Sequence, residues 1–117
     1  MSSNESIVLK QDLLSALKLA HLFSDTFNQI SVSCIPSKKI LELKTKNSNI
    51  GENTNRLNSV IKGEEIIINF NHRYIIDAFQ AIPVASVSLN FNGLSKPMVM
   101  RGVGDKSFTY LVMPMNK

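Results

Sequence analysis

Apolar and polar residues alternate in short runs along most of this sequence, and two longer segments interrupt the alternation with apolar residues at helical spacing. The two segments cover residues 11–23 and 71–82. Their apolar stripes consist of Leu13, Ala16, Leu17, Ala20 and Phe23 in the first and of Tyr74, Ile75, Ala78, Phe79 and Ile82 in the second. This spacing predicts two amphipathic helices, each with one face buried against the rest of the protein.

The alternating runs predict short antiparallel strands separated by turns. The runs lie at residues 6–10, 30–35, 40–45, 65–70, 86–91, 96–101 and 107–114. Turn signals lie at residues 36–39, 47–51, 92–93 and 104–105. The segment 52–61 is polar enough for a loop, but Leu57 and Val60 also allow an edge-like strand. Asn71 is suited to cap the second helix.

The order of predicted elements repeats, because each half of the chain has a strand, a helix and then three strands. The halves cover about residues 6–62 and 64–115, and neither could bury its helix alone. The repeat therefore predicts one duplicated β-α-β-β-β unit in a single domain, residues 1–117. The fold class is α+β, with two packed helices on one side and antiparallel sheets on the other.

The outward face of the helices is predicted to be polar and mildly basic. It carries Gln11, Ser15 and Lys18 in the first helix and Arg73, Asp77 and Gln80 in the second. Leu22 interrupts this face and is either an isolated exposed leucine or a contact with another subunit.

The net charge of +4 permits nucleic-acid binding. Lys38 and Lys39 are interpreted as turn residues.

The sequence contains no recognisable catalytic, metal or cofactor site. His21, His72 and Cys34 have no metal-ligand spacing, and Cys34 lies in an alternating run that is typical of a strand thiol. We therefore expect no catalytic residue, no metal and no cofactor. No apolar run is long enough for a membrane span, and residues 1–6 lack a signal-peptide pattern, so a cytoplasmic protein is expected.

Four segments carry a resemblance to a known family. They are QDLLSALKLAHLFSD (residues 11–25), INFNHRYIIDAFQAI (68–82), NGLSKPMVMRGVGD (92–105) and FTYLVMPM (108–115). Together they resemble the C-terminal, third domain of the bacterial DNA polymerase III β subunit, the sliding clamp. The resemblance implies that this chain corresponds to the third domain alone, and that the two domains that precede it in the family are absent from this sequence. It departs from the family at Asn116 and Lys117, where a basic and then an apolar residue are common.

The resemblance implies a non-catalytic processivity factor for DNA replication. In the family, two subunits close a ring around duplex DNA in the bacterial cytoplasm and tether the polymerase without reading sequence. A hydrophobic cleft docks short linear motifs, for example of the Gln-Leu-x-Leu-Phe type, from the polymerase III α subunit, the clamp loader and repair proteins. The alternative, suggested by the positive charge and the paired helices, is a free-standing basic nucleic-acid-binding module.

The resemblance also implies roles for particular residues. The cleft would consist of Phe27, Asn71, Tyr74, Ser95, Pro97, Leu111, Val112, Met113, Pro114 and Met115. The residues that face DNA would be Lys10, Lys18, His72 and Arg73. The contact between subunits of the homodimer ring would include Leu22 and Phe23. Strand alternation would place Leu111 and Met113 on one face and Val112 on the other, and Leu111 and Met113 could equally fill core.

Overall fold

The computed structural model describes residues 4–23, 29–47, 51–80, 82–104 and 109–115. The strands in this part form two antiparallel sheets. The five-stranded sheet has the order β5 (Val60–Gly63), β1 (Asn4–Leu9), β7 (Ser86–Phe91), β8 (Met98–Gly102) and β9 (Tyr110–Val112). The four-stranded sheet has the order β4 (Gly51–Asn58), β3 (Ile40–Asn47), β2 (Gln29–Ile35) and β6 (Ile66–Asn71).

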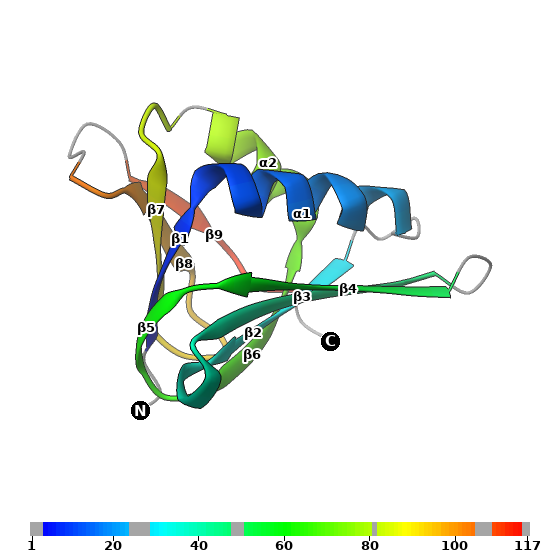
Figure 1. The fold of residues 1–117 in the computed structure, drawn as a ribbon, viewed down its shortest axis with the longest axis horizontal. Coiled ribbons are helices and arrows are strands. Elements are labelled where there is room, and N and C mark those ends of the chain that lie inside the picture. Colours follow the sequence, from blue (N-terminus) through cyan, green and yellow to red (C-terminus); the bar gives the residue numbers. More distant parts are fainter. Residues whose placement is uncertain (1–3, 24–28, 48–50, 81, 105–108, 116–117) are drawn as a thin grey trace.

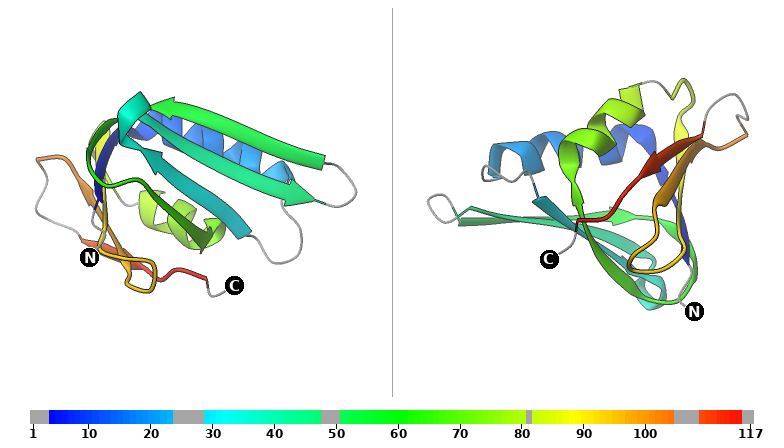
Figure 2. Two further views of the ribbon diagram at one scale, coloured as in Figure 1. Left: turned by 90° about the horizontal axis from the view of Figure 1, so that it is seen from below. Right: turned by 180° about the vertical axis from the view of Figure 1, so that it is seen from behind.

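Two helices lie together on one side of these sheets, as Figure 1 shows. Helix α1 (Lys10–Phe23) follows β1 and runs lengthwise over β3 and β4 of the four-stranded sheet. Helix α2 (His72–Gln80) follows β6 and packs beside α1, with β9 on its other flank. Figure 2 shows the four-stranded sheet from below, with α1 behind it. The predicted α+β class and the packed helices are confirmed.

The core lies between the helices and the inward faces of both sheets. The predicted stripe residues Leu13, Ala16, Leu17 and Ala20 are buried, as are Ile75, Ala78, Phe79 and Ile82. Phe70 of β6 and Phe91 of β7 bring the sheets together with ring centroids 6.2 Å apart. Tyr74 was wrongly assigned to the buried stripe, because its side chain is 62% exposed. One residue before Ile75 corresponds to about 100° around the helix, which turns Tyr74 away from the core.

The chain passes from one sheet to the other at Ser59, between β4 and β5. Strand β4 pairs with β3 in the four-stranded sheet, whereas β5 pairs with β1 in the five-stranded sheet. The Ser59 amide donates to the carbonyl of Lys39 (3.0 Å), and its hydroxyl donates to the carbonyl of Ile7 (3.0 Å). The predicted third strand of the first half is therefore two strands, with a buried serine at the corner.

The turns follow the predicted positions where the structure describes them. The 3-10 helix η1 (Pro36–Lys38) closes the hairpin between β2 and β3 and ends at Lys39 in the left-handed conformation, φ 55°. Gly93 has φ 132°, which favours glycine after β7. Residues 48–50 and Asp105 lie outside the described residues.

The β-α-β-β-β order occurs twice, first from β1 to β4 and again from β6 to β9, and β5 is an additional strand between the two units. The duplication itself stays a prediction.

Removing the Ser59 hydroxyl should destabilise this corner. Ser59→Ala leaves the Ile7 carbonyl without its side-chain donor, so the free energy of unfolding should fall by about 1 kcal/mol. The matched control is Ser37→Ala at an exposed position of η1, where a change within about 0.5 kcal/mol is expected. Urea denaturation measures both values, and equal stability of the two variants would contradict the proposed corner contact.

Candidate functional site

The last strand and the segment that follows it are tied to both sheets. Strand β9 pairs with β8, placing Val112 opposite Met98 and Leu111 opposite Val99. Beyond Val112 the chain crosses to the other sheet, where the Met115 amide donates to the Asn69 carbonyl of β6 (2.8 Å). The right-hand view of Figure 2 shows this red segment running between the sheets. The backbone of residues 110–115 is therefore fixed at two places.

Alternation along this segment leaves two large apolar side chains in solvent. Val112 points into the core and is 3% exposed. Leu111 and Met113 are 65% and 60% exposed, and Pro114 and Met115 are half-buried. Leu111 and Met113 therefore do not fill the core of this chain. Val112, which the sequence placed in the cleft, belongs mainly to the core.

A pocket of about 330 Å³ lies between α2 and β9. It is lined by Tyr74, Asp77, Ala78, Tyr110, Leu111 and Val112. The wall is mostly apolar, with the Asp77 carboxylate and the tyrosine hydroxyls as its polar side-chain groups. Such a surface can accept an apolar side chain of a partner and hydrogen-bond to the backbone beside it.

The start of α2 is fixed by Asn71, which acts as the predicted N-cap. Its Oδ1 accepts a hydrogen bond from the Arg73 amide (2.9 Å). This bond satisfies one of the free N–H groups at the helix start. It also fixes where α2 begins, and so where Tyr74 stands beside β9.

The structure brings together only some of the residues predicted for the cleft. Tyr74, Leu111 and Val112 line one pocket. Ser95 and Pro97 lie in the loop before β8, and the pairing of Met98 with Val112 places Pro97 near the level of the tail. Neither lines the pocket among its described residues. Phe27 lies outside the described residues.

Three lining residues were missed by the sequence analysis. Asp77 and Ala78 follow Tyr74 by three and four positions, so helical spacing could have identified them as its neighbours. Tyr110 begins β9 and is half-buried. Its position beside α2 depends on the packing of the helix on the sheet, which no local pattern indicates.

The residues predicted to face DNA do not share one environment. Lys18 and Arg73 are exposed on the helices. The Lys10 ammonium donates to the carbonyl of Ile82 in the segment after α2, so Lys10 is partly engaged within the domain. His72 is fully buried, which corrects the prediction that it faces outward. It occupies the first position of α2 beneath the end of α1.

The buried His72 ring meets an unusual set of neighbours. It packs edge-on against His21 of α1, with ring centroids 5.1 Å apart. Within the described part of the chain, neither of its ring nitrogens has a hydrogen-bond partner. Burial lowers the pKa of His72 below its usual 6.5, and the charges of His21 and Arg73 lower it further. The neutral ring is therefore favoured between the helices.

The predicted subunit contact at the end of α1 is only partly described. Leu22 is 66% exposed, and Leu19, which the sequence analysis did not single out, is 44% exposed. The spacing of three residues places these two leucines on one side of the helix. The side chain of Phe23 lies outside the described part of the structure.

Other reactive groups are isolated in the described residues. Burial raises the pKa of Cys34 to about 11, against a smaller lowering by the hydrogen bond from the Ser6 hydroxyl. The thiol is therefore protonated at neutral pH.

Among the described side chains, no cluster of three His, Cys, Asp or Glu residues could hold a metal ion. No helix in the described ranges is long and apolar enough to cross a membrane.

Comparison with solved structures identifies the fold as that of a sliding-clamp domain. The β subunit of DNA polymerase III from Thermotoga maritima aligns with a TM-score of 0.93 at 19% identity, over 100% of this chain and 32% of that one. The DNA polymerase sliding clamp of Bacillus subtilis aligns with a TM-score of 0.92 at 26% identity, over 100% and 31%.

Sequence comparison agrees with the fold. The family model "DNA polymerase III beta subunit, C-terminal domain" matches residues 2–116, and this chain belongs to that family. The beta sliding clamp of Synechococcus elongatus is 30% identical over 107 residues, which cover 91% of this chain and 28% of that protein. The Bacillus subtilis clamp is 27% identical, over 97% and 31%. The chain thus spans less than a third of the length of these relatives.

His72 should make the stability of this domain depend on pH. Its pKa is lowered in the folded state, so the unfolded state binds more protons below about pH 6.5. The free energy of unfolding should be highest above that pH and should fall as the pH drops toward the folded pKa. The slope for one proton is at most about 1.4 kcal/mol per pH unit.

Urea denaturation between pH 5 and pH 8 tests this dependence in the unmodified chain and in two variants. His72→Phe keeps an aromatic ring in the core and removes the titrating group, so it should flatten the dependence below about pH 6.5. His21→Gln, at an exposed position of α1, should retain most of it. An unchanged pH dependence in His72→Phe would assign the effect to other groups.

Proposed function

We propose that this chain acts as the C-terminal domain of a DNA replication processivity factor. In that role it would form part of a ring around duplex DNA and tether the polymerase by enclosing the duplex. The family assignment supports this role, since every relative described above is a sliding clamp or a DNA polymerase III β subunit. The proposed action is binding without bond-making.

The observation that carries the proposal is the pair of exposed side chains Leu111 and Met113 on a segment tied to both sheets. The backbone of this segment is held by β8 on one side and by Asn69 on the other, so the positions of these side chains are fixed. Such a surface is preorganised for a partner, so binding loses less conformational entropy. Methionine is unbranched and polarisable, which suits a surface that accepts several sequences.

The proposed occupant of the cleft is a short linear motif of the Gln-Leu-x-Leu-Phe type, from the polymerase III α subunit, the clamp loader or other clamp-binding proteins. One of its apolar side chains would enter the pocket between α2 and β9, against Tyr74 and Leu111. Met113, Pro114 and Met115 would extend the wall along the tail, with Asn71 at its far side. Ser95, Pro97 and Phe27 stay predicted members of this cleft.

The proposed contacts with DNA and with a second subunit lie on the helices. Lys18 and Arg73 present positive charge on the outward side, where a diffuse field would hold phosphates without sequence preference. Leu19 and Leu22 present an apolar strip at the end of α1 that suits the junction of a homodimer ring. A bacterial cytoplasmic location agrees with this role.

Binding of a fluorescent peptide containing Gln-Leu-Ser-Leu-Phe to this chain tests the cleft. Tyr74→Ala and Leu111→Ala remove exposed parts of the wall, and each should raise Kd by about tenfold. The matched control is Val60→Ala, because Val60 is 60% exposed on a different strand. Fluorescence anisotropy measures all four proteins, and an equal loss in Val60→Ala would contradict a specific cleft.

DNA affinity distinguishes a clamp domain from the alternative, a free-standing basic nucleic-acid-binding module. A domain that depends on ring closure should bind a linear duplex more weakly than about 10⁻⁴ M at physiological salt. A free-standing module should bind more tightly, with a Kd that rises steeply with salt concentration. A salt titration of a labelled duplex makes the measurement, and tight salt-dependent binding would favour the module.

A further inference from the structure

The outer face of the five-stranded sheet carries a patch of aliphatic side chains away from the cleft. Ile7 and Leu9 lie on this face of β1, and Val60 of β5 stands directly opposite Ile7. Val103 donates its amide to the Ser86 carbonyl (2.9 Å), and Ser86 is the partner of Leu9. These four residues, the outer aliphatic patch, therefore lie across β5, β1 and the end of β8, with Ser86 of β7 between Leu9 and Val103.

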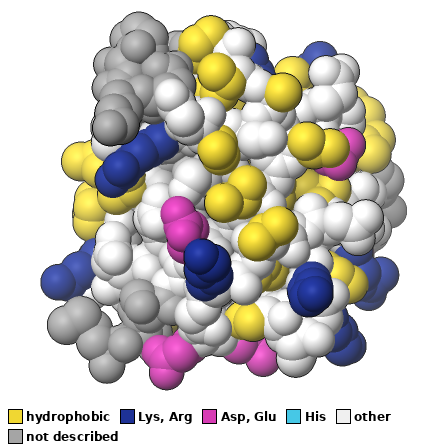
Figure 3. All heavy atoms as spheres, turned by 60° about the vertical axis from the view of Figure 1, so that its left-hand side comes forward, with side chains coloured by type: hydrophobic (Ala, Val, Ile, Leu, Met, Phe, Trp, Pro, Cys, Tyr) yellow, Lys and Arg dark blue, Asp and Glu magenta, His cyan; other side chains and the backbone are white. Residues whose placement is uncertain are grey.

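The outer aliphatic patch remains accessible to solvent. Leu9 is 53% exposed, Val60 is 60% exposed and Val103 is 43% exposed, while Ile7 between them is half-buried. Figure 3 shows several apolar side chains on this side of the molecule, with basic and acidic side chains among and around them. An exposed apolar cluster with a polar rim is typical of an interaction surface.

Two hollows on this face meet at Ile7. One, of about 590 Å³, extends from Ile7 across Ser88 to Arg101 and Thr109. The other, of about 640 Å³, extends from Ile7 past Val60 to Lys38 and Lys39. Ile7 lines both hollows, so they lie next to each other on this face. Together they are called the outer groove, which has the aliphatic patch in its middle and cations at both ends.

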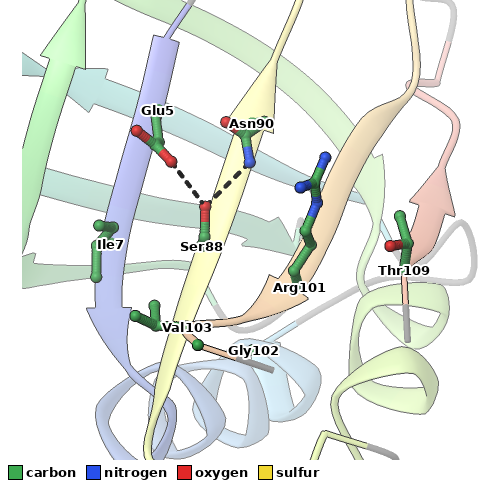
Figure 4. A pocket seen from close by; sticks show the side chains of 9 residues that line it. Glu5, Ile7, Ser88, Asn90, Arg101, Gly102, Val103 and Thr109 are labelled. Carbon is green, nitrogen blue, oxygen red and sulfur yellow. Dashed lines mark hydrogen bonds between the residues drawn. The ribbon is translucent and has the colours of Figure 1, made fainter. Parts of the chain in front are cut away.

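The cation at the first end, Arg101, is not neutralised by any of the described residues. Figure 4 shows the Ser88 hydroxyl donating to Glu5 Oε2 (3.2 Å) and Asn90 Nδ2 donating to the Ser88 Oγ (3.0 Å). Glu5 is thus engaged with the strand beside it. In the part of the chain that the structure describes, the Arg101 guanidinium has neither an ion-pair nor a hydrogen-bond partner. It stands beside the groove, available to an anion.

The second end is likewise basic. Lys38 closes η1, and Lys39 follows it in the left-handed conformation, which fixes the course of the backbone there. Both side chains are exposed, and within the described ranges neither forms an ion pair. Asp12 of α1 is the acidic residue that lines this end. The groove lining as a whole has three cations, Lys38, Lys39 and Arg101, against the acids Glu5 and Asp12.

We propose that the outer groove docks a second kind of partner segment, an extended peptide with an aliphatic centre and acidic residues at both ends. The aliphatic centre would cover Ile7, Leu9 and Val60, and the acidic ends would pair with Arg101 on one side and the lysines on the other. From β5 to β8, which carries Arg101, there are three strand spacings, about 14 Å, which about four extended residues span.

The charge of the groove argues against other occupants. A second copy of this chain, with a net charge of +4, would bring like charge to a basic groove. A single-stranded nucleic acid binds through aromatic side chains that stack on its bases, and no aromatic residue is among the described lining of the groove. This surface is separate from the cleft between α2 and β9 and goes beyond the function proposed for that cleft.

The test uses the 117-residue chain and a fluorescein-labelled peptide, Asp-Asp-Leu-Val-Ile-Leu-Asp-Asp. Saturable binding is expected, with the amide shifts in NMR spectra centred on Ile7, Val60 and Val103. Val60→Asp places a carboxylate on the aliphatic patch, and Lys38→Glu reverses a terminal charge. Each should raise Kd by about tenfold or more. Val60 and Lys38 are exposed, so both variants should fold, and thermal unfolding verifies this.

Matched controls separate this groove from general apolar or electrostatic binding. Ile67→Asp changes an aliphatic residue that is 57% exposed on β6 of the other sheet, and Lys18→Glu changes an exposed lysine on α1. Both should leave Kd within about twofold. A peptide with lysines in place of the aspartates should bind at least about tenfold more weakly.

Three results would overturn the proposal. The first is no binding of the acidic peptide at about 1 mM. The second is amide shifts centred on Tyr74 and Leu111, which would mean that the peptide occupies the other cleft. The third is equal loss of affinity in Val60→Asp and Ile67→Asp. None of these outcomes overturns the proposed function of the cleft, because that proposal is tested with a different peptide and with the Tyr74→Ala and Leu111→Ala variants.

Discussion

Each strand of this protein can bury only one of its two faces, and this constraint determines both the core and the surfaces left for partners. On β1, Val8 enters the core while Leu9 points to solvent. On β9, Val112 enters the core while Leu111 points to solvent. A buried side chain fixes the position of its strand, and the residues directly before and after it in the sequence are then held facing solvent at defined positions. Both the cleft beside α2 and the outer groove include side chains that this alternation leaves exposed, Leu111 in the first and Leu9 in the second.

The cleft depends further on how the end of the described chain is held. Pairing of β9 with β8 and the Met115–Asn69 hydrogen bond attach the segment to opposite sheets. The Asn71 cap fixes the beginning of α2 on the other side of the pocket. Hydrogen bonds of the backbone therefore place apolar side chains without covering them. A binding surface built in this way is ordered before its partner arrives, which reduces the entropy lost on binding.

Much of the fold could be predicted from the sequence because its elements follow local patterns. Helical periodicity identified the buried stripes, and alternation identified the strands and the opposite orientations of Leu111 and Val112. Tyr74 was misplaced on local helix geometry, and the other failures concern features that depend on packing between distant segments. His72 is polar and begins a helix, so nothing local shows that α1 covers it. The passage between sheets at Ser59 and the place of Tyr110 beside α2 depend on contacts across the fold. The outer groove combines residues from β1, β5, β7 and η1, and no single run of sequence contains it.

A crystal structure of this chain with a bound Gln-Leu-Ser-Leu-Phe peptide would show directly where the partner lies. We expect an apolar side chain of the peptide between Tyr74 and Leu111, while Val112 stays in the core and the Met115 amide remains bonded to the Asn69 carbonyl. A peptide bound on the outer face of the five-stranded sheet, or a displaced segment 110–115 that leaves no ordered wall, would contradict this expectation.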